Sequence, residues 1–173
     1  YDKSDEATAA FQKVENNYLE AKKLAEAAKT RPTVLSGSMY KDVWYLPGGK
    51  SWQAQFIEDA NANYLYSNTS ETGSLNLSIE NVLAKAQTAD FWVGPAQFTS
   101  YQQMLNDSPH YKQFASFQNQ KIYTYSSKKG ETGGVIYYEL APNRPDLVLK
   151  DLISIFHPYL LPDHELVFFE ALD

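Results

Sequence analysis

The chain has 173 residues, of which 43% are hydrophobic, and its formal net charge is −6. This length and apolar content suit one domain with a substantial core, whereas the negative charge and the scattered basic residues argue against a nucleic-acid-binding surface. The chain contains no cysteine, which excludes disulfides, thiolate nucleophiles and cysteine metal sites.

The first predicted element is a long polar helix over roughly residues 5 to 29. No glycine or proline precedes Pro32, and the apolar residues recur at spacings of three and four, which indicates a helix with one buried face. These apolar residues are Phe11, Val14, Tyr18, Ala21, Ala25 and Ala28. Such a helix would be about 36 Å long at about 1.5 Å per residue, enough to span a small domain.

After this helix, short apolar runs alternate with helix-like segments. Strands are predicted at Thr33 to Gly37, Asn63 to Tyr66, Ala89 to Gly94 and Lys121 to Tyr125. Helices are predicted at Ser51 to Asn61, Ser78 to Ala86, Thr99 to Asn106, Pro109 to Phe117 and Pro145 to Phe156. The alternation predicts an α/β fold, with a doubly wound, mainly parallel sheet flanked by helices and preceded by one long helix. The run Glu165 to Phe169 fits either a last strand or the edge of a helix.

Aromatic residues collect in the segments at the ends of the predicted strands. Ligands of an open parallel sheet bind beyond the C-terminal ends of its strands, and aromatic rings offer large flat contact areas to a bulky, ring-bearing ligand. Any one of these rings could instead belong to the core, but their clustering favours a binding site. We therefore predict a ligand-binding cleft lined by Tyr40, Trp44, Tyr45, Trp92 and Tyr125.

Signals for catalysis are weak. The sequence has no GxSxG elbow, no GxxxxGK[ST] loop, no GxGxxG opening a helix after a strand and no HExxH motif. His110, His157 and His164 do not have the compact spacing of a metal site. The sequence thus predicts a protein that is not an enzyme and has neither a metal site nor a cofactor. An aromatic-lined carbohydrate-binding or hydrolytic α/β domain is the alternative.

Five segments, in this order, resemble a known family: KTRPTVLSGS, WYLPGGKSW, LSIENVLAKAQTADFWVG, KIYTY and RPDLVLKDLISIFHPYLLPDH. They are similar to the C-terminal lobe and linking helix of periplasmic substrate-binding proteins of the helical-backbone class, which serve ABC transporters for iron complexes and vitamin B12. The resemblance implies a long linking helix over residues 1–30 and an α/β C-terminal lobe over residues 31–173. The N-terminal lobe of the two-lobed protein would be absent from this chain. A first residue other than Met agrees with a processed chain or a part of a longer protein.

The resemblance also implies a function. Proteins of this family capture an iron complex, such as a siderophore or haem, or a cobalamin-like ligand between two lobes and deliver it to the permease of the ABC importer. They are periplasmic or lipid-anchored at the cell envelope, so any membrane attachment would come from a lipid anchor outside this chain. Lys41 and Lys50 are the only cations near the expected cleft, which argues against a strongly anionic carboxylate siderophore as the ligand.

One residue receives a role from the resemblance alone. Ser78, Ile79 and Glu80 match a Ser-x-Glu sequence that opens a short helix near the tip of the lobe in this family. The glutamate of that sequence docks onto arginines of the permease, so Glu80 is the expected docking residue. A carboxylate at this position is also favoured by the helix dipole by roughly 0.3 to 1 kcal/mol, which leaves a purely structural explanation open.

Overall fold

Parallel strands form the centre of the molecule. In the computed structural model, which describes residues 4–173, the main sheet has the strand order β4-β1-β6-β7-β8. Its strands are β1 (Thr33–Ser36), β4 (Asn63–Tyr64), β6 (Phe91–Val93), β7 (Ile122–Thr124) and β8 (Glu170–Ala171). All neighbouring pairs are parallel except β7 and β8, which are antiparallel. The predicted α/β fold with a mainly parallel sheet is confirmed.

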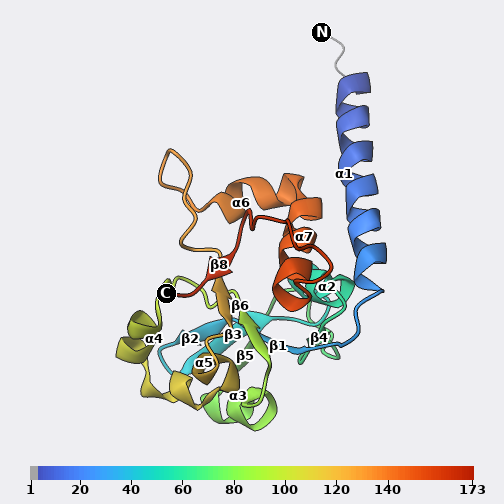
Figure 1. The fold of residues 1–173 in the computed structure, drawn as a ribbon. Coiled ribbons are helices and arrows are strands. Elements are labelled where there is room, and N and C mark those ends of the chain that lie inside the picture. Colours follow the sequence, from blue (N-terminus) through green and yellow to red (C-terminus); the bar gives the residue numbers. More distant parts are fainter. Residues whose placement is uncertain (1–3) are drawn as a thin grey trace.

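Helices cover both faces of this sheet, with α2 and α7 on one side and α3 and α5 on the other (Figure 1). The helices are α1 (Ser4–Ala25), α2 (Trp52–Asp59), α3 (Ile79–Ala86), α4 (Tyr101–Asp107), α5 (Ala115–Gln118), α6 (Ile136–Leu140) and α7 (Pro145–Phe156), with 3-10 turns η1 (Pro109–Gln113) and η2 (Ala141–Asn143). The Phe91 ring lies 5.3 Å from Phe156 of α7, whereas the next residue, Trp92, lies 5.4 Å from Phe114. Since neighbouring side chains of a strand point to opposite faces, β6 is buried on both sides, as its continuous apolar run predicted.

The predicted helix starts agree with local hydrogen bonds. The hydroxyl of Ser51 accepts a hydrogen bond from the amide of Ala54 at 3.2 Å, and the hydroxyl of Ser78 accepts one from Asn81 at 3.3 Å. These bonds satisfy amide groups that have no partner inside the first turn of a helix. Segment 109–117 is divided into η1 and α5 because the backbone is extended at Phe114 (φ −82°, ψ 134°).

A second, antiparallel sheet lies in segments for which the sequence predicted no strand. It consists of β2 (Ser38–Tyr40), β3 (Val43–Pro47) and β5 (Ser74–Leu77), in that order. Side chains of β3 alternate between the two faces, so Trp44 is fully buried while Tyr45 remains 42% exposed. The hairpin therefore adds a wall of its own beside the ends of the parallel strands.

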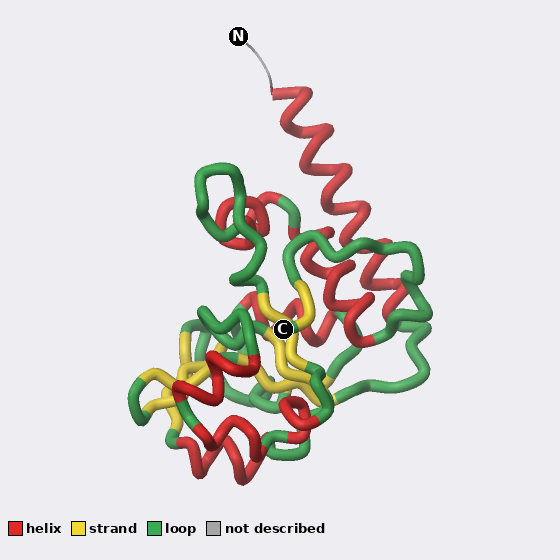
Figure 2. Tube along the Cα trace, turned by 60° about the vertical axis from the view of Figure 1, so that its left-hand side comes forward, coloured by secondary structure: helices red, strands yellow, loops and turns green. Residues whose placement is uncertain are grey.

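Helix α1 is attached to the rest of the molecule through its C-terminal half. Asn17 donates a hydrogen bond to Asp146 of α7 at 3.2 Å, and Tyr18 donates one to Asp59 of α2 at 2.6 Å. Figures 1 and 2 show that the N-terminal half extends away from the body, and Phe11 in that half is 72% exposed. Within residues 4–173, no helix combines the length and apolarity that crossing a bilayer requires.

A buried carboxylate holds the segment before β8. Asp151 of α7 is fully buried and accepts hydrogen bonds from the three consecutive amides of residues 167–169, at 2.7 to 3.1 Å. Its Oδ1 also lies 2.7 Å from Nε2 of His164. Glu165 to Phe169 is therefore neither strand nor helix, and the last strand begins at Glu170.

Replacing Asp151 by alanine should lower the free energy of unfolding by about 3 kcal/mol, because three amide groups lose a buried acceptor. Urea denaturation followed by circular dichroism would measure the change. Asp163→Ala is the matched control, since Asp163 is exposed in the same segment and its removal should change stability by less than about 0.5 kcal/mol. Equal effects of the two substitutions would contradict the anchoring role of Asp151.

Candidate ligand-binding site

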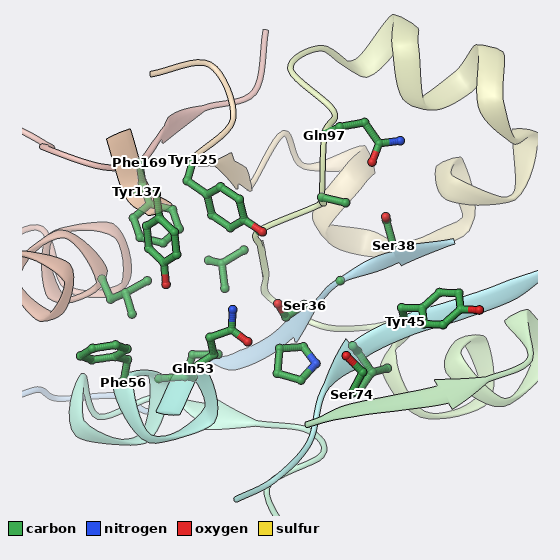
Figure 3. A pocket seen from close by; sticks show the side chains of 18 of the residues that line it. Ser36, Ser38, Tyr45, Gln53, Phe56, Ser74, Gln97, Tyr125, Tyr137 and Phe169 are labelled. Atoms are coloured by element: carbon green, nitrogen blue, oxygen red, sulfur yellow. The ribbon is translucent and has the colours of Figure 1, made fainter. Parts of the chain in front are cut away.

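A hollow of about 370 Å³ lies at the C-terminal ends of the parallel strands. Its walls come from the ends of β1, β6 and β7, from α2 and from the antiparallel sheet (Figure 3). The labelled residues in that view are Ser36, Ser38, Tyr45, Gln53, Phe56, Ser74, Gln97, Tyr125, Tyr137 and Phe169. The position is the one at which ligands of open α/β sheets bind.

Stacked aromatic rings form one wall of the hollow. Tyr125, just after β7, stacks on Tyr137 of α6 with ring centroids 4.5 Å apart and an interplanar angle of 15°. The Phe169 ring meets Tyr125 edge-on at 5.9 Å, and the Tyr138 hydroxyl donates a hydrogen bond to the Tyr125 hydroxyl at 3.3 Å. Burial raises the pKa of Tyr125 well above its ordinary value and raises the pKa of Tyr137 to about 12. Both side chains are therefore neutral phenols at physiological pH.

The floor of the hollow is the backbone that follows β1. Gly37 has φ 79°, and a Cβ atom there would lie 1.9 Å from the carbonyl oxygen of Tyr45, so only glycine fits between the two sheets. The indole N–H of Trp44 donates to the carbonyl of Ser36 at 3.1 Å, and that of Trp92 donates to the carbonyl of Gly37 at 2.8 Å. The two tryptophans thus fix the backbone of the floor by hydrogen bonds from the core side.

The structure brings three of the five predicted lining residues to the hollow and corrects the other two. Tyr40, Tyr45 and Tyr125 line it. Trp44 and Trp92 are fully buried, with ring centroids 5.1 Å apart, and they do not line it. Their assignment to the cleft was wrong because the strand alternation of β3 and β6 turns both rings into the core.

The serines and glutamines of the lining were not predicted. The side chains of Ser36 and Ser38 are largely buried, while Gln53 and Gln97 contribute amides from α2 and from the loop after β6. The sequence held a signal for two of them, since Ser36 lies near the end of a predicted strand and Gln53 lies in the first turn of a predicted helix. Nothing in the sequence marks Gln97, because its place depends on how the loop after β6 turns.

The expected docking residue lies outside the hollow. Glu80 is fully exposed in the first turn of α3. Hydrogen bonds, first from its own backbone N–H and then from the Ser78 hydroxyl, hold the pKa of this carboxyl below its usual range. The side chain is therefore an ionised, accessible carboxylate. Among residues 4–173, no group of three or more histidine, aspartate or glutamate side chains is arranged to hold a metal ion.

Comparison with known proteins identifies the family. The family described as periplasmic binding protein matches residues 1–128. The chain belongs to this family. An uncharacterized lipoprotein from Methanocaldococcus jannaschii is 29% identical over 172 residues, which are 98% of this chain and 39% of the relative. A second protein of that organism is 21% identical and matches over 50% of its own length. The chain thus spans half or less of the length of these two relatives.

Solved structures share the fold of this periplasmic binding protein. The TroA-like periplasmic binding protein FepB from Veillonella parvula has a TM-score of 0.68 at 11% identity, covering 99% of this chain and 57% of that one. The periplasmic heme-binding protein RhuT from Roseiflexus has a TM-score of 0.61 at 20% identity, covering 85% and 54%. The family is one of periplasmic binding proteins rather than of enzymes, and membership in it assigns the protein to the periplasmic side of the cell envelope. The solved structures show that the fold is shared.

Gly94→Ala tests how tightly the aromatic wall is fixed. Gly94 has φ 66°, and a Cβ atom there would lie 3.0 Å from Cε1 of Tyr125. We expect the left-handed backbone to cost about 1 kcal/mol and the displacement of the stacked Tyr125 ring to cost about 1 to 3 kcal/mol more. Gly133→Ala is the matched control, since Gly133 has φ 84° and open space around it. Urea denaturation would measure the loss of unfolding free energy in both variants. Equal losses would mean that displacing the Tyr125 ring costs no free energy.

Proposed function

We propose that this chain is the C-terminal lobe and linking helix of the substrate-binding component of an ABC importer. In this proposal the protein captures an iron complex, a haem or a cobalamin-like ligand between two lobes and delivers it to the permease. The observation that carries the proposal is the aromatic hollow at the ends of the parallel strands, in a chain that belongs to the periplasmic binding protein family.

The division into a helix over residues 1–30 and a lobe over residues 31–173 is supported by the exposed face of α1. Residues 1–3 of that helix segment lie outside the described residues. Phe11 and Leu19 of α1 are 72% and 54% exposed, and Trp52 of α2 is 51% exposed. All three line a second, open hollow of about 1140 Å³ between α1 and α2. Exposed apolar area of this kind is typical of a surface that another body covers, and a preceding lobe is the proposed occupant.

The ligand class is supported by chemistry and by the relatives. Tyr40, Tyr45 and Tyr125 give flat contact surfaces that suit a large, partly planar ligand. The Roseiflexus protein is named as heme-binding, and the Methanocaldococcus relative is named as a lipoprotein, which agrees with a lipid anchor on the complete protein. The hollow has the volume of a small-molecule site.

The ligand can be sought by tryptophan fluorescence of the full-length protein, titrated with haem, cobalamin and ferric siderophores. We expect saturable quenching by one of these, because Trp44 and Trp92 lie directly behind the floor of the hollow. The isolated lobe should bind more weakly, since it supplies one side of the cleft. No quenching by any of the compounds, together with binding of soluble glycans, would contradict the proposed transport function.

Tyr45→Ala should weaken binding of the quenching ligand roughly three- to tenfold, since a lost ring contact is worth about 1 kcal/mol. Tyr159→Ala is the matched control, because Tyr159 has a similar exposure of 49% but does not line the hollow. The dissociation constants come from the same titration. Equal affinities of the two variants would remove Tyr45 from the proposed contact surface.

Glu80 is the proposed permease-docking residue. We expect Glu80→Ala to leave ligand affinity unchanged, because Glu80 does not line the hollow, and to reduce stimulation of the transporter ATPase. An exposed charge at the rim of an interface acts mainly on the rate and orientation of association, so the defect should diminish at saturating binding protein. Glu165→Ala is the control, since Glu165 is an exposed carboxylate elsewhere. Stimulation equal to that of the unmodified protein would exclude docking through Glu80.

A further inference from the structure

The hollow offers hydrogen bonds but no charge. Among the described residues that line it, none is aspartate, glutamate, lysine, arginine or histidine. Its polar groups are serine hydroxyls, glutamine amides and tyrosine phenols, and burial keeps the phenol of Tyr125 protonated by raising its pKa. The lining is therefore electrically neutral at physiological pH.

Several of these polar groups have no hydrogen-bond partner among residues 4–173. Ser36 and Ser38 are only 8% and 6% exposed, and no hydrogen bond joins either hydroxyl to another described residue. The side-chain amides of Gln53 and Gln97 likewise have no partner among residues 4–173. Because these hydroxyls and amides line the hollow, they are available to hydrogen-bond with a ligand seated there.

The arrangement of the groups fits a ligand that both donates and accepts hydrogen bonds. Gln53 reaches into the hollow from α2, and Tyr125 extends toward it from the opposite wall, with Ser36 on the floor (Figure 3). A glutamine side chain carries a donor and an acceptor, as an amide of the ligand does, and a serine hydroxyl does both as well. A ligand amide can therefore pair with any of these residues, whereas a carboxylate only accepts.

The two cations that the sequence placed near the cleft are not among the residues that line the hollow. The Lys41 ammonium lies 5.5 Å from the centroid of the exposed Tyr40 ring, and Lys50 lines the other hollow, between α1 and α2. A ligand carboxylate placed against Ser36 and Tyr125 would lose water without meeting a cation among the lining residues. Desolvating an unpaired charge in this way is costly.

We infer that the ligand surface seated against this lobe is uncharged and bears amide, carbonyl or hydroxyl groups around a flat apolar face. The inference rests on the proposed function and narrows its ligand class to electrically neutral metal complexes with an amide-bearing periphery. Anionic complexes, including those that carry several carboxylates or catecholates, are disfavoured by the same lining.

Two matched pairs of probes test this inference on the full-length protein. The first pair is cyanocobalamin and its monocarboxylate derivative, in which one peripheral amide is replaced by a carboxylate. The second pair is a neutral ferric trishydroxamate and an anionic ferric tricatecholate. We expect the uncharged member of at least one pair to bind at least tenfold more tightly than its anionic partner.

Charge introduced by substitution gives an independent readout. Gln53→Glu and Gln97→Glu should each weaken binding of the uncharged probe roughly tenfold, since a carboxylate replaces an amide that donates a hydrogen bond. Gln120→Glu is the matched control, because Gln120 is exposed in the loop before β7 and does not line the hollow. Gln97 is itself exposed, so its substitution should leave the thermal midpoint unchanged and report on binding alone.

The outcomes separate the inference from the proposed function. Weaker binding by both hollow variants, with the control unchanged, supports the inference. Tighter binding of an anionic probe overturns the inference but leaves an importer of metal complexes in place. The inference is also overturned if neither Gln53→Glu nor Gln97→Glu changes the affinity for the uncharged probe. If none of these probes binds but haem does, the inference fails alone; if haem does not bind either, the inference and the proposed function fail together.

Discussion

The hollow at the ends of the parallel strands depends on two indole N–H groups that fix the backbone at which the two sheets meet. Trp44 comes from the antiparallel sheet and Trp92 from the parallel one, yet they bond to the adjacent carbonyls of Ser36 and Gly37. Phe114 packs against both indole rings at 5.3 and 5.4 Å. An unpaired polar group in this core would cost about 1 to 3 kcal/mol, so displacement of the floor is opposed by hydrogen bonding as well as by packing.

The opposite wall is fixed by the same kind of interaction. Asp151 accepts the amides of residues 167–169 and so places the Phe169 ring against Tyr125 and Tyr137. Buried polar groups thus locate both sides of the hollow, while its surface itself presents flat rings and unpartnered neutral groups. A site formed in this way before the ligand arrives loses little conformational entropy on binding, and that is one source of affinity.

The sequence predicted the parallel part of the fold because each signal there is local. Ser51 and Ser78 cap helices, Pro145 starts one, and continuous apolar runs indicate buried strands. The antiparallel sheet was missed because of its hairpin turn. The turn position with φ 55° is occupied by Lys41, whereas a glycine or an asparagine usually marks such a position in the sequence. Because β3 was not predicted, nothing in the neighbouring sequence indicated that the Trp44 side chain is buried. The polar lining was missed for a different reason, since Ser36, Gln53 and Gln97 meet only through the topology.

Helix α7 connects the aromatic wall of the hollow to the long first helix. Asp146 and Asp151 are both fully buried on α7. Although burial alone would raise it, the pKa of Asp146 is lowered by hydrogen bonds from Arg144 and from Asn17 of α1, so the carboxylate is ionised. One end of α7 therefore binds α1, and its next turn binds the segment that carries Phe169. A rotation of α1 against this lobe would have to break the partly buried, charge-assisted bond between Asn17 and Asp146, whereas a rotation of α1 and the lobe together would leave it intact. Motion in the complete protein should accordingly carry α1, α7 and the aromatic wall as one rigid unit.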